Sequence, residues 1–173
     1  MLFRSKDLYD VDENSLLFEF SDRVSAYDVK FSQDIPKKGK VLCRFAEFWF
    51  DKLEVSNHFI SRESDTTILV KKMKMIPMEC VVRGYFYGSL IGRWKNGSIQ
   101  LPDNTDTTLA AKLTKPLFDP TTKSEHDVPV DKEMALEMNL VSEEQYVWLE
   151  KTSIDIYERM ASVANDAGFI LAD

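Results

Sequence analysis

What the sequence lacks sets the first limits on its function. It has only two cysteines, Cys43 and Cys80, which form neither a disulfide framework nor a metal-ligand spacing. Lys and Arg number 22 against 29 Asp and Glu, so the charge favours neither nucleic acid nor an anionic membrane. No apolar run reaches membrane-spanning length, and M-L-F-R-S-K-D at the N-terminus lacks a signal-peptide core. We therefore expect a cytosolic (cytoplasmic) protein with no nucleic-acid or membrane partner, whose cysteines are small buried thiols.

The sequence does contain enough apolar residues for a packed core. Hydrophobic residues make up 44% of the chain and aromatic residues 12%. We find no internal repeat and no low-complexity linker, so 173 residues fit one domain or two small lobes that share a core. Because the net charge is -7, any anionic ligand must be held by local basic residues against an unfavourable overall field.

Apolar patterns predict a mixture of strands and helices. Val41, Phe45 and Phe48 belong to an apolar stripe that predicts a helix over residues 40–54. We expect mostly loop over residues 101–123, because this segment carries three prolines and many polar residues. The remaining apolar runs predict strands over residues 16–20, 27–31, 66–75 and 79–87.

The clearest predicted element is a long helix from Ser142 to Gly168. Ser142 with Gln145 three residues later forms a capping-box pattern, and Gly168 stands where a helix commonly ends. An apolar run then begins at Phe169, which predicts a strand, and the sequence stops at Asp173. We therefore expect the chain to be truncated relative to a longer ancestor.

The most informative stretch runs from Met75 to Ser89, M-I-P-M-E-C-V-V-R-G-Y-F-Y-G-S. Glu79 and Arg83 lie in a segment that otherwise looks like buried strand, and such side chains are rarely buried unless they are paired or bound to a charged group. A guanidinium followed by Gly88 and Ser89 is a plausible clamp for a phosphate or carboxylate. The alternative is a structural Glu79–Arg83 pair on one strand face.

Three further segments combine charged and hydroxyl side chains, and each alone is a weak signal. Residues 21–28, S-D-R-V-S-A-Y-D, could be functional or could form a solvated turn. Residues 35–42, I-P-K-K-G-K-V-L, place lysines before a helix, where they oppose the helix dipole but are useful if an anion sits there. Residues 120–127, P-T-T-K-S-E-H-D, form a loop whose histidine is more often a hydrogen-bonding group than a catalytic base.

The order of these segments is far more specific than any one of them. S-D-R-x-S-A-x-D, I-P-x-K-G-x-V-L, P-x-E-x-V-V-R-G-Y-x-x-G-S, P-L-F-x-P-T-T-K and H-D follow one another along the chain. Together they resemble the SAICAR synthetase family (phosphoribosylaminoimidazole-succinocarboxamide synthase) of purine biosynthesis. The resemblance extends from about Lys6 to Asp173.

The resemblance implies a fold and a reaction. The fold is a two-lobed α+β structure, with an antiparallel sheet and a helix in an ATP-covering lobe over residues 1–75. Residues 76–173 would form an incomplete C-terminal lobe for substrate and ATP. The family joins L-aspartate to the carboxylate of CAIR, the carboxylated aminoimidazole ribonucleotide, using ATP and Mg²⁺. The carboxylate is activated as an acyl phosphate, which the aspartate amine attacks, so positioning and charge neutralisation do most of the work.

The same resemblance assigns candidate site residues. On the ATP side it implies Lys6, Met73, Lys74, Met75 and Glu79, with backbone groups reading the adenine edge while methionines pack its face. Candidate catalytic residues are Arg83, Lys123 and Asp127. The substrate-binding set implied for CAIR and aspartate comprises Asp22, Arg23, Ser25, Asp28, Lys38, Gly39, Arg83, Ser89 and Lys123.

The chain departs from the family at its C-terminal end. The family continues I-L-x-D with x-K-x-E-F-G, whereas this sequence stops at Asp173, its one candidate Mg²⁺ ligand. We therefore expect too few carboxylates for the metal in cis. Two functions follow from this, an active synthetase or a non-catalytic relative that binds a nucleotide or a partner. For both we expect self-association or binding to a full-length synthetase around residues 169–173.

Overall fold

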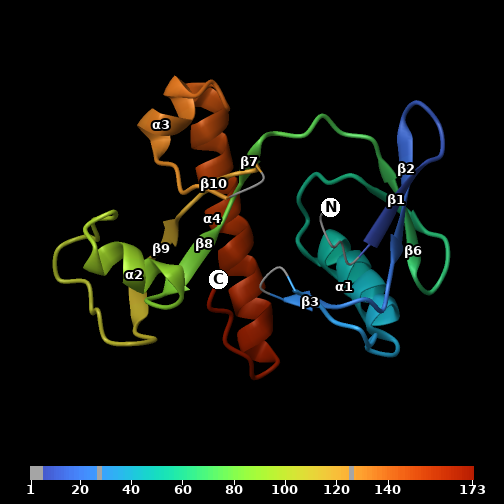
Figure 1. Ribbon diagram of the computed structural model, residues 1–173, viewed down its shortest axis with the longest axis horizontal. Helices are drawn as coiled ribbons and strands as arrows, with labels where there is room; N and C mark the ends of the chain where they lie inside the picture. The colour runs from blue at the N-terminus through green and yellow to red at the C-terminus, as the bar shows by residue number, and fades with distance from the viewer. Residues whose placement is uncertain (1–5, 27–28, 125–126) are drawn as a thin grey trace. The chain divides into compact units, whose positions relative to one another are not determined.

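The computed structural model describes residues 6–26, 29–124 and 127–173, and Figure 1 shows its helices and strands. The chain divides into two compact units, residues 1–74 and residues 75–173, each with hydrophobic clusters of its own. Strands pair antiparallel in both units, so the expected α+β class is confirmed. Within the described ranges, none of the helices is long and apolar enough to cross a membrane.

The first unit is a four-stranded antiparallel sheet that packs against one helix. Its sheet has the strand order β1-β2-β6-β5, and helix α1 covers a core of Phe20, Cys43, Ile68 and Val70. The predicted strand over 16–20 and helix over 40–54 are therefore confirmed. In chain order the elements are β1 (Lys6–Asp10), β2 (Ser15–Phe20), β3 (Ser25–Ala26), β4 (Val29–Lys30), α1 (Lys38–Lys52), β5 (Phe59–Arg62) and β6 (Thr67–Lys71).

The second unit combines two small antiparallel pairs, β8 with β9 and β7 with β10, with three helices. Its long helix α4 begins with a complete capping box, in which Ser142 and Gln145 each accept a hydrogen bond from the other's backbone N–H. The predicted long helix is thus confirmed. In chain order the elements are β7 (Met78–Glu79), β8 (Val82–Tyr85), α2 (Ser89–Lys95), β9 (Lys112–Phe118), β10 (Thr121–Thr122), α3 (Lys132–Glu137) and α4 (Glu143–Asp166).

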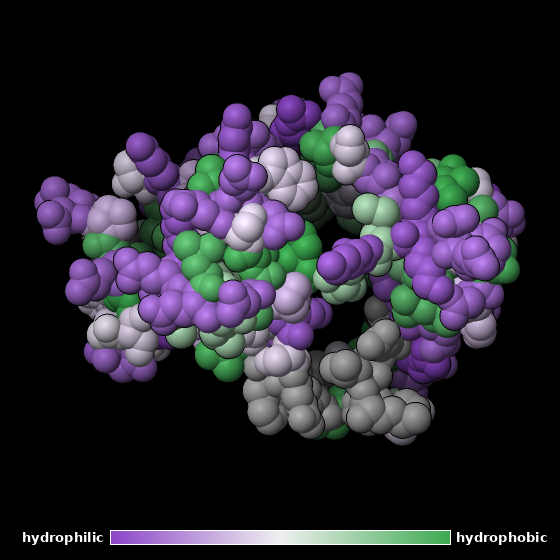
Figure 2. Space-filling model, turned by 90° about the horizontal axis from the view of Figure 1, so that it is seen from above, coloured by the Kyte–Doolittle hydropathy of each residue, from purple (hydrophilic) through white to green (hydrophobic). Residues whose placement is uncertain are grey.

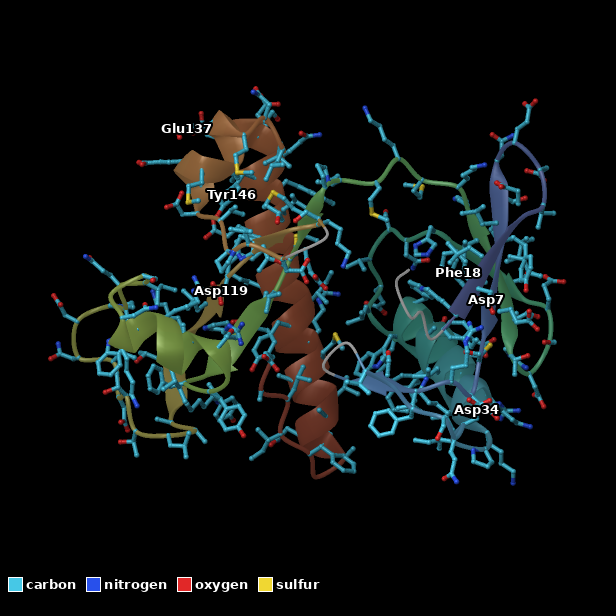
Figure 3. All side chains as sticks on the ribbon, in the orientation of Figure 1. Asp7, Phe18, Asp34, Asp119, Glu137 and Tyr146 are labelled. Atoms are coloured by element: carbon cyan, nitrogen blue, oxygen red, sulfur yellow. The ribbon has the colours of Figure 1, made fainter. Side chains whose placement is uncertain are left out.

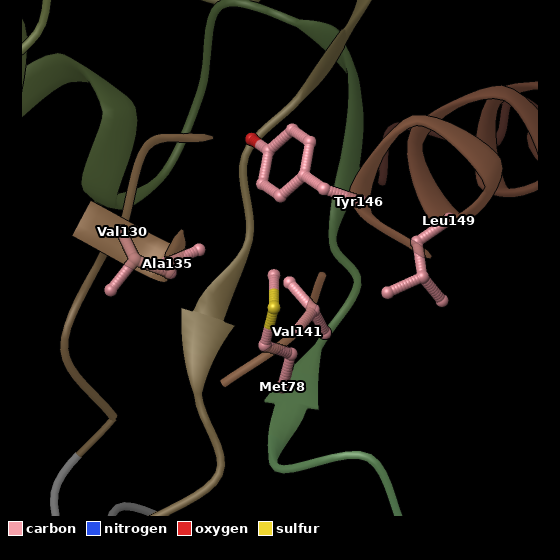
Figure 4. Packing of buried hydrophobic residues seen from close by; sticks show 6 residues of the cluster. All are labelled: Met78, Val130, Ala135, Val141, Tyr146 and Leu149. Carbon is pink, nitrogen blue, oxygen red and sulfur yellow. The ribbon is translucent and has the colours of Figure 1, made fainter. Parts of the chain in front are cut away.

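Tyr146 lies in the hydrophobic cluster that fixes α4 against β7 and α3. Figure 4 shows its ring near Met78 and Val141, and Phe118 meets the ring edge-on with centroids 5.7 Å apart. Burial raises the pKa of Tyr146 to about 12, because the phenolate would lose its hydration. A second cluster, built on Phe86, Leu90 and Leu113, holds α2 against the β8–β9 pair.

Two predicted segments differ in type from the structure, whereas the strands predicted over 66–75 and 79–87 are found in shortened form, as β6 and as β7 with β8. The loop expected over residues 101–123 is wrong in its second half, where β9 pairs with β8. Pro116 is tolerated there because it lies in the stretch where the β8–β9 register shifts, between the pairs Arg83–Leu117 and Tyr85–Lys112. The strand expected from Phe169 is also wrong, because residues 169–173 have no regular structure. They are held instead by individual hydrogen bonds, of which Ala172 O accepts one from Gly84 N–H.

The two cysteines differ in burial. Cys43 is fully buried in α1, as expected, whereas Cys80 is only half-buried. In both cases burial raises the pKa of the thiol, so neither is poised as a thiolate. Figure 2 shows green, hydrophobic areas that reach the surface between purple side chains. Exposed apolar residues include Phe45, Trp148 and Ile170.

Candidate functional site

The best-defined charged cluster of the second unit is centred on Asp119, directly after β9 (Figure 3). Its Oδ2 accepts a hydrogen bond from Arg83 Nε, and its Oδ1 accepts one from Arg93 Nη1, both at 2.6 Å. The Asp119 side chain is 3% exposed, against 12% for Arg83 and 19% for Arg93. Strand pairing places it there, because Asp119 N–H donates to Val81 O at the end of the β8–β9 ladder.

The terminal nitrogens of Arg83 have other partners. Nη2 donates to Ser89 Oγ and Nη1 donates to Asp173 Oδ2, both at 3.0 Å. Gly88 stands immediately before Ser89 with φ at +62°, a conformation that costs little for glycine, and this turn starts α2 beside the guanidinium. Arg83 and Ser89, which the sequence paired as a clamp, therefore do lie together. The alternative of a Glu79–Arg83 ion pair is wrong, because these residues have different partners.

The segment 169–173 is held on α4 and β8 by hydrogen bonds to two consecutive residues. Tyr157 hydroxyl donates to Leu171 O, and Gly84 N–H donates to Ala172 O, each at 2.8 Å. A Cβ on Gly84 would overlap the Tyr157 hydroxyl, so glycine is required for this close approach. Burial raises the pKa of Tyr157, which keeps its hydroxyl protonated as a donor. These contacts bring the Asp173 carboxylate to Arg83.

A cavity of about 490 Å³ lies beside this segment. Its wall includes Tyr85 of β8, Lys112 of β9, Glu158 of α4 and Phe169. The lining mixes polar and apolar side chains from elements far apart in sequence.

A second charged pair in this unit involves Lys123 and Glu79. Thr121 lies opposite Glu79 in the β7–β10 pair, and Lys123 N–H donates to Pro77 O. This brings Lys123 Nζ to 3.2 Å from Glu79 Oε2, with both side chains about half exposed. The structure therefore joins a candidate catalytic residue to a candidate ATP-side residue. Asp127 is exposed at the edge of the described range.

In the first unit, the candidate substrate residues gather at the start of α1. Asp22 Oδ2 accepts the N–H of Lys37 at 3.0 Å, and Asp22 Oδ1 accepts the N–H of Gly39 at 2.8 Å. The backbone N–H groups at this lysine-rich helix terminus are thus met by the protein's own carboxylate. Gly39 is needed because a Cβ there would lie 2.5 Å from Phe20 O. Lys38 Nζ donates to Arg23 O at 2.9 Å.

The remaining candidates of the first unit are more dispersed. Arg23 forms an ion pair of 2.8 Å with Asp7, and this hydrogen bond raises the pKa of Arg23. Lys6 Nζ lies 4.3 Å from the centroid of the Phe18 ring, a cation–π contact. Ser25 is exposed in β3, and the candidate Asp28 lies outside the described residues.

The candidate adenine segment falls where the two units meet in sequence. Met73 and Lys74 belong to the first unit and Met75 to the second, and both methionine side chains are largely exposed. Met73 also lines a cavity of about 560 Å³ with residues such as Asn14 and Lys72.

Sequence reasoning missed Asp119 and Arg93. The signal for Asp119 was present in P-L-F-D-P, where an acid stands among apolar residues and prolines at a position that β-pairing buries. Such a residue must have a charged or hydrogen-bonding partner. Arg93 lies four residues after Ser89, so one turn of α2 brings it to the same cluster.

The described residues form no cluster of three or more metal-ligating side chains. This holds for the His, Cys, Asp and Glu side chains of residues 6–26, 29–124 and 127–173. Asp173, the candidate ligand, forms an ion pair with Arg83. The role of Asp173 as a Mg²⁺ ligand therefore stays a prediction.

Known proteins resemble this chain in sequence and in fold. The sequence model of SAICAR synthetase matches residues 4–173. A phosphoribosylaminoimidazole-succinocarboxamide synthase of Nitrosopumilus maritimus is 74% identical over 168 residues, covering 97% of this chain and 61% of the relative. The corresponding synthase of Candida maltosa is 36% identical over 186 residues, covering 97% of this chain and 63% of that protein. The chain thus spans about three fifths of the length of these curated relatives.

Solved structures agree with the sequence comparison. The SAICAR synthase of Saccharomyces cerevisiae complexed with SAICAR has a TM-score of 0.86 and 29% identity, covering 99% of this chain and 64% of that one. A SAICAR synthetase in complex with ADP, 23% identical with a TM-score of 0.83, shares the fold over 99% of this chain and 71% of that structure. The chain belongs to the SAICAR synthetase family.

Proposed function

We propose that this chain takes part in the SAICAR synthetase reaction, the ATP-dependent ligation of L-aspartate to CAIR that gives SAICAR, ADP and phosphate. Membership of the family over residues 4–173 supports this proposal, as does 74% identity to a relative named for the activity. The S. cerevisiae neighbour binds the reaction product, SAICAR.

The observation that carries the proposal is the fixed guanidinium of Arg83. CAIR is an anion with a phosphate and a carboxylate, and this chain has a net charge of -7, so a local cation must hold the ligand. Arg83 presents Nη1 and Nη2 beside the hydroxyl of Ser89, and a planar guanidinium suits a two-oxygen anion. In our proposal CAIR replaces the Asp173 carboxylate on Arg83.

The chemistry joins two steps. A CAIR carboxylate oxygen attacks the γ-phosphorus of ATP, which forms the acyl phosphate and releases ADP. The aspartate amine then attacks the acyl carbon, loses a proton and expels phosphate, which leaves the amide. We assign Lys123 to neutralise carboxylate charge, and Asp127 to contact the aspartate side.

The other candidates are proposed to shape the ATP-binding side and the substrate-binding side of the site. Asp22 and Gly39 would act by fixing the start of α1, since Asp22 accepts the Gly39 N–H and Gly39 packs closely on Phe20 O. Glu79 would act through its ion pair with Lys123. The remaining proposed contacts are Lys6, Met73, Lys74 and Met75 for ATP, and Arg23, Ser25, Asp28 and Lys38 for the substrates.

Calorimetric titration of an Arg83→Ala variant tests this assignment. CAIR binding should weaken by about 2–4 kcal/mol, or about 30- to 1000-fold, because a charged contact is lost, while ATP binding should change much less. Arg62→Ala is a matched control, since Arg62 forms a partly exposed ion pair with Glu47 in the first unit. Unchanged CAIR affinity in Arg83→Ala would show that the site is assigned wrongly.

An ADP-release assay separates ligation from binding alone. ATP, Mg²⁺, CAIR and L-aspartate are each omitted in turn, and ADP release should require CAIR. The non-catalytic alternative rests on one observation, that the described residues form no metal cluster. It would be favoured by CAIR or ATP binding without ADP release. ADP release that increases more than in proportion to protein concentration would support the predicted association with a second chain.

A further inference from the structure

We propose that Asp119 is a positioning residue for the anion-binding guanidinium of Arg83, and that Arg93 keeps this site positively charged. The inference rests on the proposed function, because it assigns a role to residues around the same ligand. It concerns two residues that do not themselves need to touch the ligand.

Asp119 limits how the Arg83 guanidinium can turn. A free arginine side chain can turn any of its five N–H groups toward a ligand. Asp119 Oδ2 accepts a hydrogen bond from Arg83 Nε at 2.6 Å. Asp119 is itself fixed, because its backbone N–H donates to Val81 O. With Nε engaged, the outward groups are Nη1 and Nη2, which face Asp173 and Ser89. Asp119 therefore selects the edge of the guanidinium that meets an anion.

Arg93 balances the negative charge of Asp119. One carboxylate paired with Arg83 alone would cancel the charge that the ligand needs. Asp119 is shared, because Arg93 Nη1 donates to its other oxygen at 2.6 Å. Two guanidinium groups around the Asp119 carboxylate leave one net positive charge in a place where Asp119 is only 3% exposed. The half-exposed Asp173 carboxylate balances that charge until an anionic ligand replaces it on Arg83. Arg93 thus allows Arg83 to be held by an acid and still attract an anion.

Arginine side-chain NMR tests, without any ligand, whether Asp119 holds the Arg83 guanidinium in one orientation. In the full chain, the Nε–H of Arg83 should exchange slowly with water, and Asp119→Asn should abolish this protection. Asp65→Asn is the matched control, because Asp65 also joins basic side chains but is half exposed in the first unit. Rapid exchange of the Arg83 Nε–H in the unaltered protein would overturn the proposal.

Binding of inorganic phosphate and of CAIR tests how Asp119 and Arg93 affect the affinity of the site for anions. Asp119→Asn should lower both affinities about tenfold because the Arg83 guanidinium is no longer held in one orientation, even though a negative charge is removed. Asp119→Glu should recover part of the loss because it restores a carboxylate that can accept from both guanidinium groups. Arg93→Met should also weaken binding and reduce its salt dependence, while the Arg83 Nε–H stays protected.

The outcomes separate this inference from the function itself. If phosphate binds and responds to Asp119 while CAIR does not bind, the proposed function is wrong and the positioning role stands. If the Asp119 and Arg93 variants fold and bind both anions like the unaltered protein, Asp119 only stabilises the fold and the inference is wrong. Binding of neither anion by the unaltered protein would also overturn it.

Discussion

Two carboxylates of this chain each join several basic side chains, and they differ in their access to water. Asp119 of the second unit is 3% exposed and is held by two guanidinium groups at 2.6 Å. Asp65 of the first unit is 52% exposed, with Lys40 at 2.5 Å, Arg44 at 3.3 Å and Arg62 at 3.8 Å.

The difference shows that the number of charged partners does not measure how much a cluster contributes to stability. Water competes for every group around Asp65, so ion pairs there add little to stability. The Lys40 hydrogen bond, followed by that from Arg44, still lowers the pKa of Asp65. Around Asp119, water is excluded, and each member needs the others to stay buried. The buried cluster can therefore hold a side chain in one orientation, whereas the exposed one cannot.

The largest expected effect comes from removing the buried carboxylate. Asp119→Ala should lower the free energy of unfolding of the second unit by about 2–4 kcal/mol, because two largely buried guanidinium groups lose their partner. Asp65→Ala should have a much smaller effect in the first unit. Urea denaturation followed by hydrogen exchange in each unit measures both. Equal losses for the two variants would remove the distinction between the clusters.

Helix caps extend the comparison to the backbone. α1 is capped by the carboxylate of Asp22 from the preceding loop, whereas α4 is capped by the hydroxyl of its own Ser142. Asp22→Ala and Ser142→Ala should each cost about 0.5–2 kcal/mol of stability. Thermal unfolding can rank them, with the exposed Ser98→Ala as a surface control. We expect Asp22→Ala to cost more, because Asp22 accepts two backbone N–H groups.

A smaller effect is expected where the buried cluster meets water, at Asp173. Its side chain is 54% exposed and occupies Nη1 of Arg83, so it competes with any anion there. Asp173→Asn should raise phosphate affinity by roughly two- to fivefold, the range for an exposed ion pair. Asp166→Asn, at the end of α4, controls for the change in net charge. A loss of affinity in Asp173→Asn would show that Asp173 helps to bind the anion instead of competing.

The smallest effect concerns pH in the first unit. His58 packs between Phe18 and Phe50, and burial, followed by the charge of Lys6, lowers its pKa below 6.5. The unfolded chain therefore binds a proton at higher pH than the folded chain does. Stability should be complete above about pH 6.5 and should fall below it, until the folded pKa is reached. Asp65 does not titrate in this window, since its pKa is lowered from 3.8. His58→Phe should flatten a plot of unfolding free energy against pH between 7.5 and 5.5, and an unchanged slope would exclude His58 as its source.

The predictions that succeeded from sequence rest on short-range patterns. The stripe containing Phe45 and Phe48 predicted α1, and Ser142 with Gln145 predicted the start of α4, because helical contacts join residues three or four apart. Prediction failed in residues 101–123, where three prolines and many polar residues suggested a loop, because β9 depends on pairing with β8. The roles proposed for Lys123, Asp127 and the other site residues stay predictions.

The sequence by itself determined the family, the α+β class, helices α1 and α4, and the proximity of Arg83 to Ser89. All of these depend on residues close together in the chain or on motifs in a fixed order. Only the tertiary structure decided the partners of Arg83, because Asp119 is 36 positions away and Asp173 is 90 positions away. Strand register and burial bring these groups together, and the exclusion of water gives that pairing its strength.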